Sequence, residues 1–413
     1  MARYQEIEVR YTKSPDTFFP VGTLAQKDDQ VFFEYDQSWL IRGLELSPFF
    51  LPLQPGLISH KDHRFGPLFG LFDDSLPDGW GLLLMDRSFR SRGIDPATIS
   101  VLDRLLYLGI ETMGALTYHP PEKRDDPGSF TINLQELAEE ARQVFAGKST
   151  DILPLLMRAG GSPGGARPKV LVGFNPDNHE MLSGENDLPA DFEHWIVKFP
   201  SREEGADEGM IEYAYSLMAG MAGIEMAETR LFPAGKGEHF FGVKRFDRKP
   251  GNLRHHIHSF GNLIHANFRI PACDYGDLFK TASLLTNNYL DIERVYRLMA
   301  FNVMAHNRDD HVKNFAFLLD DHTGEWALAP AYDLTFAQGP GGEHTTTVLG
   351  EGMHPSRQQC VRLAGRYGIA PALAETIFDE VTEAVSHWPE CAERAGLSEE
   401  SMQRIGYFFS RIS

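Results

Sequence analysis

Apolar residues recur at helical spacing in several stretches of this chain. In "PDGWGLLLMDRSFRSRG", Leu82, Met85 and Phe89 fall on one side of a helix. Asp78 can accept hydrogen bonds from the first free amides, and Gly93 can end the helix in a left-handed conformation. The stretch therefore predicts a capped helix whose role is packing.

Similar periodicity predicts further helices, and short apolar runs bounded by turn residues predict strands. Helices are expected in "FTINLQELAEEARQVF", from about Glu208 to Ala222, and in "DIERVYRLMAFNVMAHN", "ETIFDEVTEAVSHW" and "ESMQRIGYFFSRI". Strands are expected in "QVFFEY", "KVLVGF", "HWIVKFP" and "EHFFGVK", and a hairpin from Phe315–Leu319 and Trp326–Leu328. The proline-rich polar stretch at 119–129 indicates a subdomain junction.

Composition limits the setting of the protein. The 413 residues can bury a large core, and no apolar stretch approaches the roughly 20 residues of a membrane helix. We therefore expect a multi-lobed cytoplasmic protein without a membrane partner. Cys273, Cys360 and Cys391 suit neither a disulfide framework nor a paired zinc motif. The net charge of −19 disfavours direct binding of nucleic acid but allows a basic partner.

A glycine-rich stretch, "RAGGSPGGARPK", leads into the strand "KVLVGF". Glycine lets backbone amides approach a phosphate, and Arg167 and Lys169 would add positive charge to such an anion site. The spacing matches neither standard phosphate-loop motif, so an ordinary glycine-rich hairpin is an equally good reading of it. Pro163 and Pro168 stiffen the stretch and remove two amide donors.

Lys198 ends the apolar strand "HWIVKFP", where a lysine either reaches solvent or meets an anion. Glu212 lies beside the apolar stripe of the following helix and could pair with it. Solvent exposure is the more common outcome for a single lysine or glutamate, and we expect it for both residues and for the charges of "VKRFDR". His256 and His258 share a spacing seen in metal sites, but without a complete ligand set we expect packing roles.

Asp309 follows the helix that ends near "AHN", and Asn314 comes five positions later. The same separation occurs in the catalytic loop of protein kinases, where the acid orients the attacking hydroxyl and the amide binds magnesium. The predicted hairpin then returns the chain to Asp333, which could supply a second oxygen ligand for magnesium. A structural network of ion pairs is the alternative explanation for these acids.

In these residues the chain resembles the HipA family of serine/threonine kinases, the toxins of bacterial toxin–antitoxin pairs. The resemblance rests on "NRDDHVKNFAFLL" and "LAPAYDLT", and extends to "SLPDGWG", "GGSPGGARPK", "HWIVKFP" and "VKRFDR". It implies an α+β, two-lobed protein-kinase-like fold with a strand-rich N-terminal lobe and a helical C-terminal lobe. The implied divisions are 1–124 for the N-terminal subdomain, 125–246 for the rest of the N-lobe, and 247–413 for the C-lobe.

The resemblance also implies a role for each matching residue. Asp309 would accept or orient the proton of the substrate hydroxyl, Asn314 and Asp333 would hold Mg²⁺, and Ser162 would be autophosphorylated. A phosphate on Ser162 would add about two negative charges to a loop built for ATP phosphates, and so would displace that loop. The implied nucleotide-binding residues are Gly164, Gly165, Ala166, Arg167, Lys169, Lys198, Lys244, Phe246, His311, Lys313 and Tyr332.

The function expected from these residues is magnesium-assisted transfer of the ATP γ-phosphoryl group to a serine or threonine of a cytoplasmic protein. The resemblance implies a HipB-like helix-turn-helix antitoxin as partner, with only indirect contact to DNA. Aminoacyl-tRNA synthetases are family targets, although nothing in these residues selects one, and the histidine-rich "HHIHSFGNLIH" indicates a divergent branch.

Two other functions stay open at the level of sequence. The first is a nucleotide-binding regulator that phosphorylates nothing. The second is a metal-dependent phosphohydrolase built on His306, Asp309, Asp310 and His311. It leaves the glycine-rich stretch and Lys198 without a role.

Overall fold

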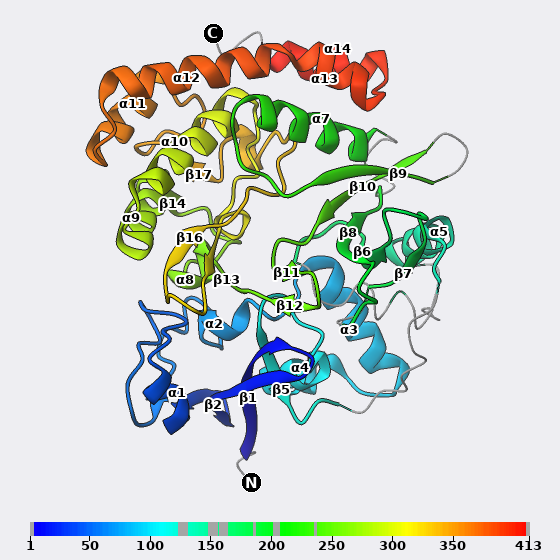
Figure 1. Ribbon diagram of the computed structural model, residues 1–413, viewed down its shortest axis with the longest axis vertical. Helices are drawn as coiled ribbons and strands as arrows, with labels where there is room; N and C mark the ends of the chain where they lie inside the picture. The colour runs from blue at the N-terminus through cyan, green and yellow to red at the C-terminus, as the bar shows by residue number, and fades with distance from the viewer. Residues whose placement is uncertain are drawn as a thin grey trace.

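The computed structural model describes residues 4–122, 131–147, 156, 164–184, 187–200, 207–234 and 238–409. Sheets dominate the N-terminal part of the chain and helices dominate the C-terminal part (Figure 1). The N-terminal sheet lies at one end of the molecule, and helices α11 to α14 lie at the other (Figure 1). The strand-rich N-terminal part and helical C-terminal part expected from the sequence are confirmed.

A five-stranded antiparallel sheet in the order β4-β3-β2-β1-β5 forms the N-terminal end. Ile7, Val9 and Tyr11 alternate along β1 and are buried, so one face of the sheet meets the core. The predicted strand "QVFFEY" is confirmed as β3. The elements of this part are β1 (Tyr4–Ser14), β2 (Thr17–Lys27), β3 (Gln30–Tyr35), α1 (Gln37–Arg42), β4 (Ile58–Ser59), α2 (Gly70–Asp73), α3 (Gly79–Ser91), η1 (Pro96–Thr98), α4 (Val101–Leu108) and β5 (Leu116–His119).

A second five-stranded antiparallel sheet, in the order β7-β6-β8-β10-β9, carries the predicted phosphate-loop strand and Lys198. Leu137 of α5 and Trp80 of α3 share a core with Val170 of this sheet. The expected strands and the helix beginning at Glu208 are confirmed. The elements are α5 (Leu134–Phe145), β6 (Lys169–Phe174), β7 (Met181–Ser183), β8 (Glu193–Lys198), α7 (Glu208–Met221), β9 (Thr229–Pro233) and β10 (His239–Lys244).

The helical part is built around α10, which is buried along most of its length and packs against α9, α11 and α12. The predicted hairpin is confirmed as β15 and β16, with β13 as a third strand. The elements are β11 (Arg248–Lys249), β12 (Leu253–Arg254), β13 (His256–Ser259), α8 (Phe260–Leu263), β14 (Cys273–Asp274), α9 (Tyr275–Thr286), α10 (Tyr289–Met304), η2 (Val312–Asn314), β15 (Ala316–Leu319), β16 (Trp326–Leu328), η3 (Pro340–Gly342), β17 (Thr346–Thr347), α11 (Arg357–Arg366), α12 (Pro371–Ser386), α13 (Trp388–Ala395) and α14 (Glu399–Phe409).

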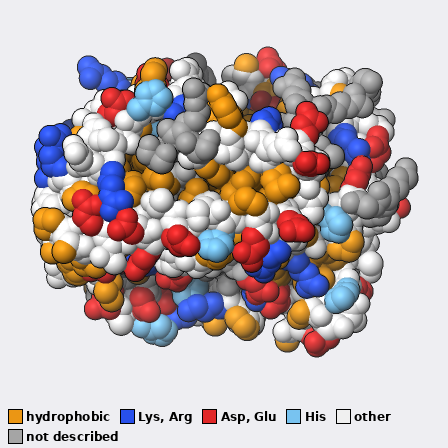
Figure 2. Space-filling view, turned by 90° about the horizontal axis from the view of Figure 1, so that it is seen from above, with side chains coloured by type: hydrophobic (Ala, Val, Ile, Leu, Met, Phe, Trp, Pro, Cys, Tyr) orange, Lys and Arg blue, Asp and Glu red, His pale blue; other side chains and the backbone are white. Residues whose placement is uncertain are grey.

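Helix α7 joins the second sheet to the helical part, because it contacts β9 and β10 as well as α12 and α13. Seen from the α11 to α14 end, hydrophobic side chains gather at the middle of the face and charged side chains surround them (Figure 2). None of the helices within the described ranges is long and apolar enough to span a bilayer.

Three charges of "VKRFDR", on Arg245, Asp247 and Arg248, are buried, so the expectation that they are solvated is wrong for these three. The Lys244 side chain is 35% exposed. Asp247 accepts hydrogen bonds from both the Arg245 and Arg248 guanidinium groups and from the Gly114 amide. This network compensates the burial of three charges and ties the N-terminal sheet region to the segment after β10. The division after residue 246 therefore falls inside a buried network and stays a prediction, as does the one at residue 124, which lies outside the described residues.

The packing roles expected for the histidine pair are confirmed. His256 contacts the Leu46 carbonyl at 3.2 Å, and His258 lies between the Asp74 carboxylate and the Ser47 hydroxyl. Both rings are buried. Among the described residues, no group of three His, Cys, Asp or Glu side chains is arranged to hold a metal ion.

Candidate functional site

Lys198 lies at the end of β8, and its ammonium group pairs with the carboxylates of Glu212 on α7 and of Asp333. The Lys198 side chain is only 10% exposed and that of Glu212 only 3%. The pairing that the sequence allowed between them is confirmed, and the expectation of solvated side chains is wrong. Burial disfavours the charged lysine, but the two carboxylates outweigh that effect and raise its pKa above the usual value.

Lys169 stands directly opposite Lys198 in the pairing of β6 with β8. Like charges in that position repel, unless anions lie between or beside them. Burial and the charge of Lys198 lower the pKa of Lys169, whose Nζ donates to the Gly164 carbonyl. Burial opposes ionisation of Asp333, yet Lys198 and Lys169 hold the pKa of its carboxyl well below the usual range. The two lysines therefore create a position that favours negative charge.

Arg167 is held against α7 by acids of that helix. Its Nη2 lies 2.7 Å from Glu208 Oε2 and its Nη1 lies 3.7 Å from Glu212 Oε2. Glu212 is thus shared by Arg167 and Lys198, which fixes two cations on one buried carboxylate. Two of the charges expected at a phosphate site are therefore positioned by the same helix.

The N-terminus of α3 is hydrogen-bonded to the segment that precedes β6. The Gly165 amide donates to the Asp78 carboxylate, the Trp80 amide donates to the Gly165 carbonyl at 3.0 Å, and Trp80 Nε1 donates to the Lys169 carbonyl at 3.0 Å. Gly79, at φ +42°, allows this approach, since a Cβ there would come 2.6 Å from the Gly165 oxygen. Asp78 does stand at the start of the helix, but its side chain makes no cap hydrogen bond, so that detail of the expected cap is wrong.

Asp309 and Asn314 lie together in the loop after α10. Asn314 Nδ2 donates to the Asp309 carbonyl at 2.7 Å, which fixes the turn between them. Asp309 reaches solvent, yet neighbouring atoms desolvate it enough to raise the pKa of its carboxyl, and Asp333 and Asp310 add to this rise. His311 and Arg167 oppose it.

Asp310 points the other way, into the interior. Its carboxylate accepts hydrogen bonds from Tyr275 Oη at 2.8 Å, from His344 at 2.9 Å and from the Thr345 amide at 2.9 Å. This aspartate anchors the loop and leaves Asp309 as its outward acid. His306 stacks on Phe336 instead of facing Asp310. The cluster required for a metal-dependent phosphohydrolase is therefore not assembled by these side chains.

Most of the other predicted nucleotide-binding residues lie near this loop. Tyr332 Oη donates to the Lys313 carbonyl at 2.7 Å, and its ring lies 5.7 Å from that of Phe246. The His311 ring accepts from the Lys313 amide at 3.3 Å. Lys244 is different, because its ammonium group turns to Glu193 and Glu228. Ser162 lies outside the described residues, and Ala166 packs beside Gly79.

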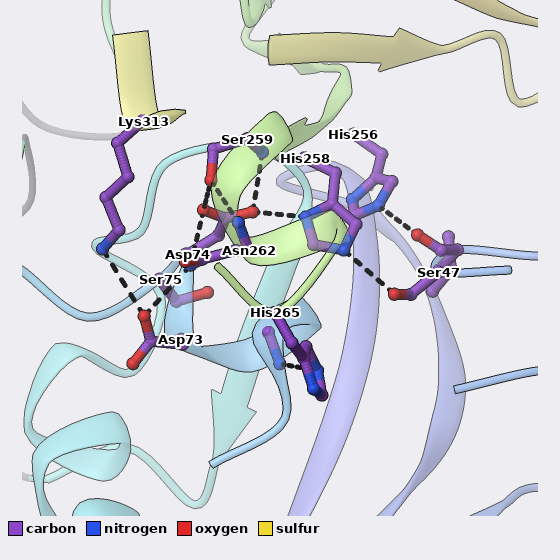
Figure 3. Close-up of polar contacts among 12 residues, drawn as sticks. Ser47, Asp73, Asp74, Ser75, His256, His258, Ser259, Asn262, His265 and Lys313 are labelled. Carbon is purple, nitrogen blue, oxygen red and sulfur yellow. Dashed lines mark hydrogen bonds and ion pairs between the residues drawn. The ribbon is translucent and has the colours of Figure 1, made fainter. Parts of the chain in front are cut away.

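Three residues contribute to the site in roles that were not predicted from the sequence: Asp73, Asp78 and Asp310. The Lys313 ammonium group lies 3.4 Å from Asp73 and 3.9 Å from Asp78, and Figure 3 shows Asp73 reaching it from the N-terminal subdomain. The density of acids in "LFDDSLPDGW" is the sequence signal that could have drawn attention to the first two. The loop brings Asp310 beside Asp309 with an opposite orientation, which a linear pattern does not reveal.

Comparison with known protein families finds two matching family models. Residues 18–119 match the HipA N-terminal domain, and residues 161–388 match the HipA-like C-terminal domain. The putative kinase Y4dM of Sinorhizobium fredii is 27% identical over 281 residues, which cover 64% of this chain but only 61% of that relative, less than two thirds of its length. The putative kinase Y4mE of the same organism is 28% identical over 336 residues, covering 76% of this chain and 74% of that protein.

A solved structure shares the fold over almost the whole chain. It is HipA of Shewanella oneidensis MR-1, determined with HipB and its operator DNA. The TM-score is 0.73 at 18% sequence identity, and the alignment covers 98% of this chain and 95% of that one.

Proposed function

The chain belongs to the HipA family, and on this premise we propose that it is an ATP-dependent protein kinase that phosphorylates serine or threonine. The observation that carries the proposal is the meeting of Lys198 with Glu212 and Asp333. A strand lysine paired with a helix glutamate, next to an aspartate that can bind magnesium, is what phosphoryl transfer in protein kinases requires.

The residues around Asp309 fit the remaining roles. Asp309 would accept or orient the proton of the substrate hydroxyl, and its raised pKa makes it a better base than an ordinary aspartate. Asn314 and Asp333 offer oxygen ligands, which Mg²⁺ prefers. Because Asn314 uses its Nδ2 on the Asp309 carbonyl, its Oδ1 is left for a cation. Bound Mg-ATP would supply the phosphoryl group and neutralise its developing charge.

The nucleotide would be held from two sides. We assign its phosphates to Lys169, Lys198, Arg167 and the backbone from Gly164 to Ala166, because positive charge concentrates there. We assign the base to the aromatic pair of Phe246 and Tyr332 and to the backbone near Lys244, with His311 and Lys313 nearby.

We further propose that the protein is the toxin of a toxin–antitoxin pair in the cytoplasm, with a HipB-like antitoxin through which it meets DNA. The solved HipA of Shewanella oneidensis MR-1, which shares the fold, forms such a complex with HipB and operator DNA. Autophosphorylation at Ser162 would switch the kinase off by adding charge beside the phosphate-binding segment. The substrate is a cytoplasmic protein, with aminoacyl-tRNA synthetases the first candidates to test.

Incubation with γ-labelled ATP, magnesium and a set of candidate proteins tests the proposal. The wild-type protein should transfer label to protein, and Asp309→Asn should reduce the rate by about 10²–10⁴-fold. Asp320→Asn is the matched control, because the Asp320 carboxylate accepts hydrogen bonds from two amides of its own turn, in the hairpin after the loop. A rise in melting temperature with Mg-ATP but no labelled protein would favour the regulatory module instead. Release of free phosphate from many phosphoesters would favour a phosphohydrolase.

A further inference from the structure

Helix α14 packs against α13 and carries two neighbouring aromatic residues, Phe408 and Phe409. Of the described residues of this helix only Ile405 is fully buried, and both phenylalanines are half-buried. Each phenylalanine ring contacts a segment of the chain that carries residues of the candidate site. The helix therefore reaches the site, although none of its own residues is assigned to phosphoryl transfer.

The Phe408 ring packs on the two segments that carry the proposed catalytic acid and a proposed metal ligand. Its centroid lies 4.9 Å from that of His306 and 5.1 Å from that of Phe336. The rings of His306 and Phe336 stack on each other at 5.5 Å, 14° from parallel. His306 precedes Asp309 by three positions, and Phe336 follows Asp333 by three. The rings of His306, Phe336 and Phe408, here called the aromatic cluster, thus join the two segments.

The same two segments are also hydrogen-bonded to each other through their backbones. The Ala337 amide donates to the His306 carbonyl at 3.2 Å, and the Arg308 amide donates to the Ala337 carbonyl at 3.3 Å. His306 adopts φ +52°, a conformation that costs free energy for a residue with a Cβ and persists only where its surroundings hold it. Burial, and then the charge of Arg308, lowers the pKa of His306 to about 4, so its ring is neutral near pH 7 and packs as an aromatic ring. The aromatic cluster is thus one of the contacts that hold this backbone.

The Phe409 ring extends these contacts to helix α7. Its centroid lies 6.4 Å from that of Tyr215, which follows Glu212 by three positions. The Tyr215 hydroxyl donates to the carbonyl of Ala305, the residue directly before His306. Through its two phenylalanines, α14 therefore contacts the helix that carries Glu212 as well as the two segments that the aromatic cluster joins.

We propose that Phe408 is a positioning residue for phosphoryl transfer, because its ring holds the Asp309 loop and the Asp333 segment in register with each other. The inference rests on the proposed kinase function and adds α14 to the residues that serve it. Phe408 acts through His306 and Phe336 and is not a contact of the reacting atoms. Phosphoryl transfer depends on the fixed placement of the acid and the metal ligands, so a small displacement of either segment lowers the rate.

Steady-state kinetics of label transfer from γ-labelled ATP tests the proposal. Phe408→Ala should lower kcat by about 10–100-fold and change the KM for ATP by about twofold at most, because the acid is displaced while the nucleotide contacts stay. Phe408→Tyr keeps the ring and should retain most of the wild-type kcat. Phe145→Ala is the matched control, since Phe145 is a partly exposed phenylalanine at the end of α5, and its kcat should equal that of the wild type.

Hydrogen exchange of the same proteins without ATP gives a readout that does not depend on catalysis. The Arg308 and Ala337 amides should exchange faster in Phe408→Ala than in the wild type and in Phe145→Ala, whereas the Met299 amide inside α10 should keep its rate. If the whole of α10 also exchanges faster, Phe408→Ala has lost its fold. Phe408→Leu, which keeps an apolar side chain but not the stacked ring, then decides the question and should lower kcat.

The outcomes separate this inference from the proposed function. Wild-type kcat in a folded Phe408→Ala or in Phe408→Leu would overturn the inference and leave the kinase function standing. Equal losses of kcat in Phe408→Ala and Phe145→Ala would overturn it as well. A wild type that transfers no label to protein would overturn the proposed function itself and this inference with it.

Discussion

At the residue scale, Glu212 is the least replaceable side chain of the Lys198 cluster, which consists of Lys198, Arg167, Glu212 and Asp333. It is buried, and it faces Lys198 and Arg167 together. Removing one partner of a buried pair costs more than the pair contributes, because the remaining charge stays desolvated. Asp333 is 36% exposed, so solvent screens part of its attraction for Lys198. Asp333 could therefore only partly compensate for the loss of Glu212.

Glu212→Gln should therefore lower the free energy of unfolding by about 2–3 kcal/mol, because two buried cations lose a charged partner. Glu228→Gln is the matched control. Glu228 pairs with Lys244 at 3.4 Å and is 61% exposed, so its loss should cost under about 1 kcal/mol. Urea unfolding of both variants measures the difference, and equal losses would contradict the account of the cluster.

The pH dependence of Asp309 is a second prediction at this scale. Its pKa is raised by desolvation and by the charges of Asp333 and Asp310. An acid with a raised pKa takes up its proton at a higher pH, so kinase activity should fall on acidification before an ordinary aspartate would be protonated. Carboxyl titration by NMR should place the pKa above 3.8 in the wild type and lower it in Asp333→Asn. A wild-type value at or below 3.8 would exclude the proposed environment.

At the scale of elements, local patterns predicted the strands and helices that carry the site, including β6, β8, α7 and the β15–β16 hairpin. Their side chains alternate or recur within a few residues, so a short window contains the signal. A short window does not reveal the hydrogen-bond partner of a residue at the end of a helix. Asp78 was predicted from its neighbours to cap α3, but its carboxylate accepts a hydrogen bond from the Gly165 amide, 87 positions away.

The hydrogen bonds between the start of α3 and the segment before β6 predict a positioning role for Asp78. Asp78→Ala should raise the KM for ATP about tenfold with a smaller change in kcat, because Gly165 loses its anchor. Asp78→Asn keeps an oxygen acceptor and should restore most of the affinity. Asp86→Ala, on the same helix and paired with Arg104, is the control and should leave KM unchanged. A lower KM in Asp78→Ala would instead mean that the carboxylate competes with ATP phosphate.

At the scale of the whole molecule, a buried polar network joins the N-terminal subdomain to the helical part. The Asp74 carboxylate accepts from the His258 ring, from the Ser259 amide and hydroxyl, and from Asn262 (Figure 3). These contacts span about 185 residues, and the β13–β15 pairing next to them also joins distant segments. The sequence predicted most residues of the candidate site but not this assembly, because a spacing pattern carries no information on such distant partners.

Asp74→Ala should destabilise the protein by about 3–5 kcal/mol, because four donors lose one acceptor in a buried interface. Asp16→Ala, at an exposed turn, should cost less than about 0.5 kcal/mol. Urea unfolding measures both free energies. Hydrogen exchange should show the N-terminal sheet opening before the helical part in Asp74→Ala, whereas uniform exchange across both would contradict the coupling role of Asp74.

The central claim is that one loop acid drives phosphoryl transfer from a nucleotide held by Lys198, Asn314 and Asp333. Phosphosite mass spectrometry after incubation with Mg-ATP tests it most directly, with wild type and Asp309→Asn compared side by side. We predict phosphate on Ser162 in the wild type and none in Asp309→Asn. Equal phosphorylation of the two proteins, or an unmodified wild type, would contradict the account.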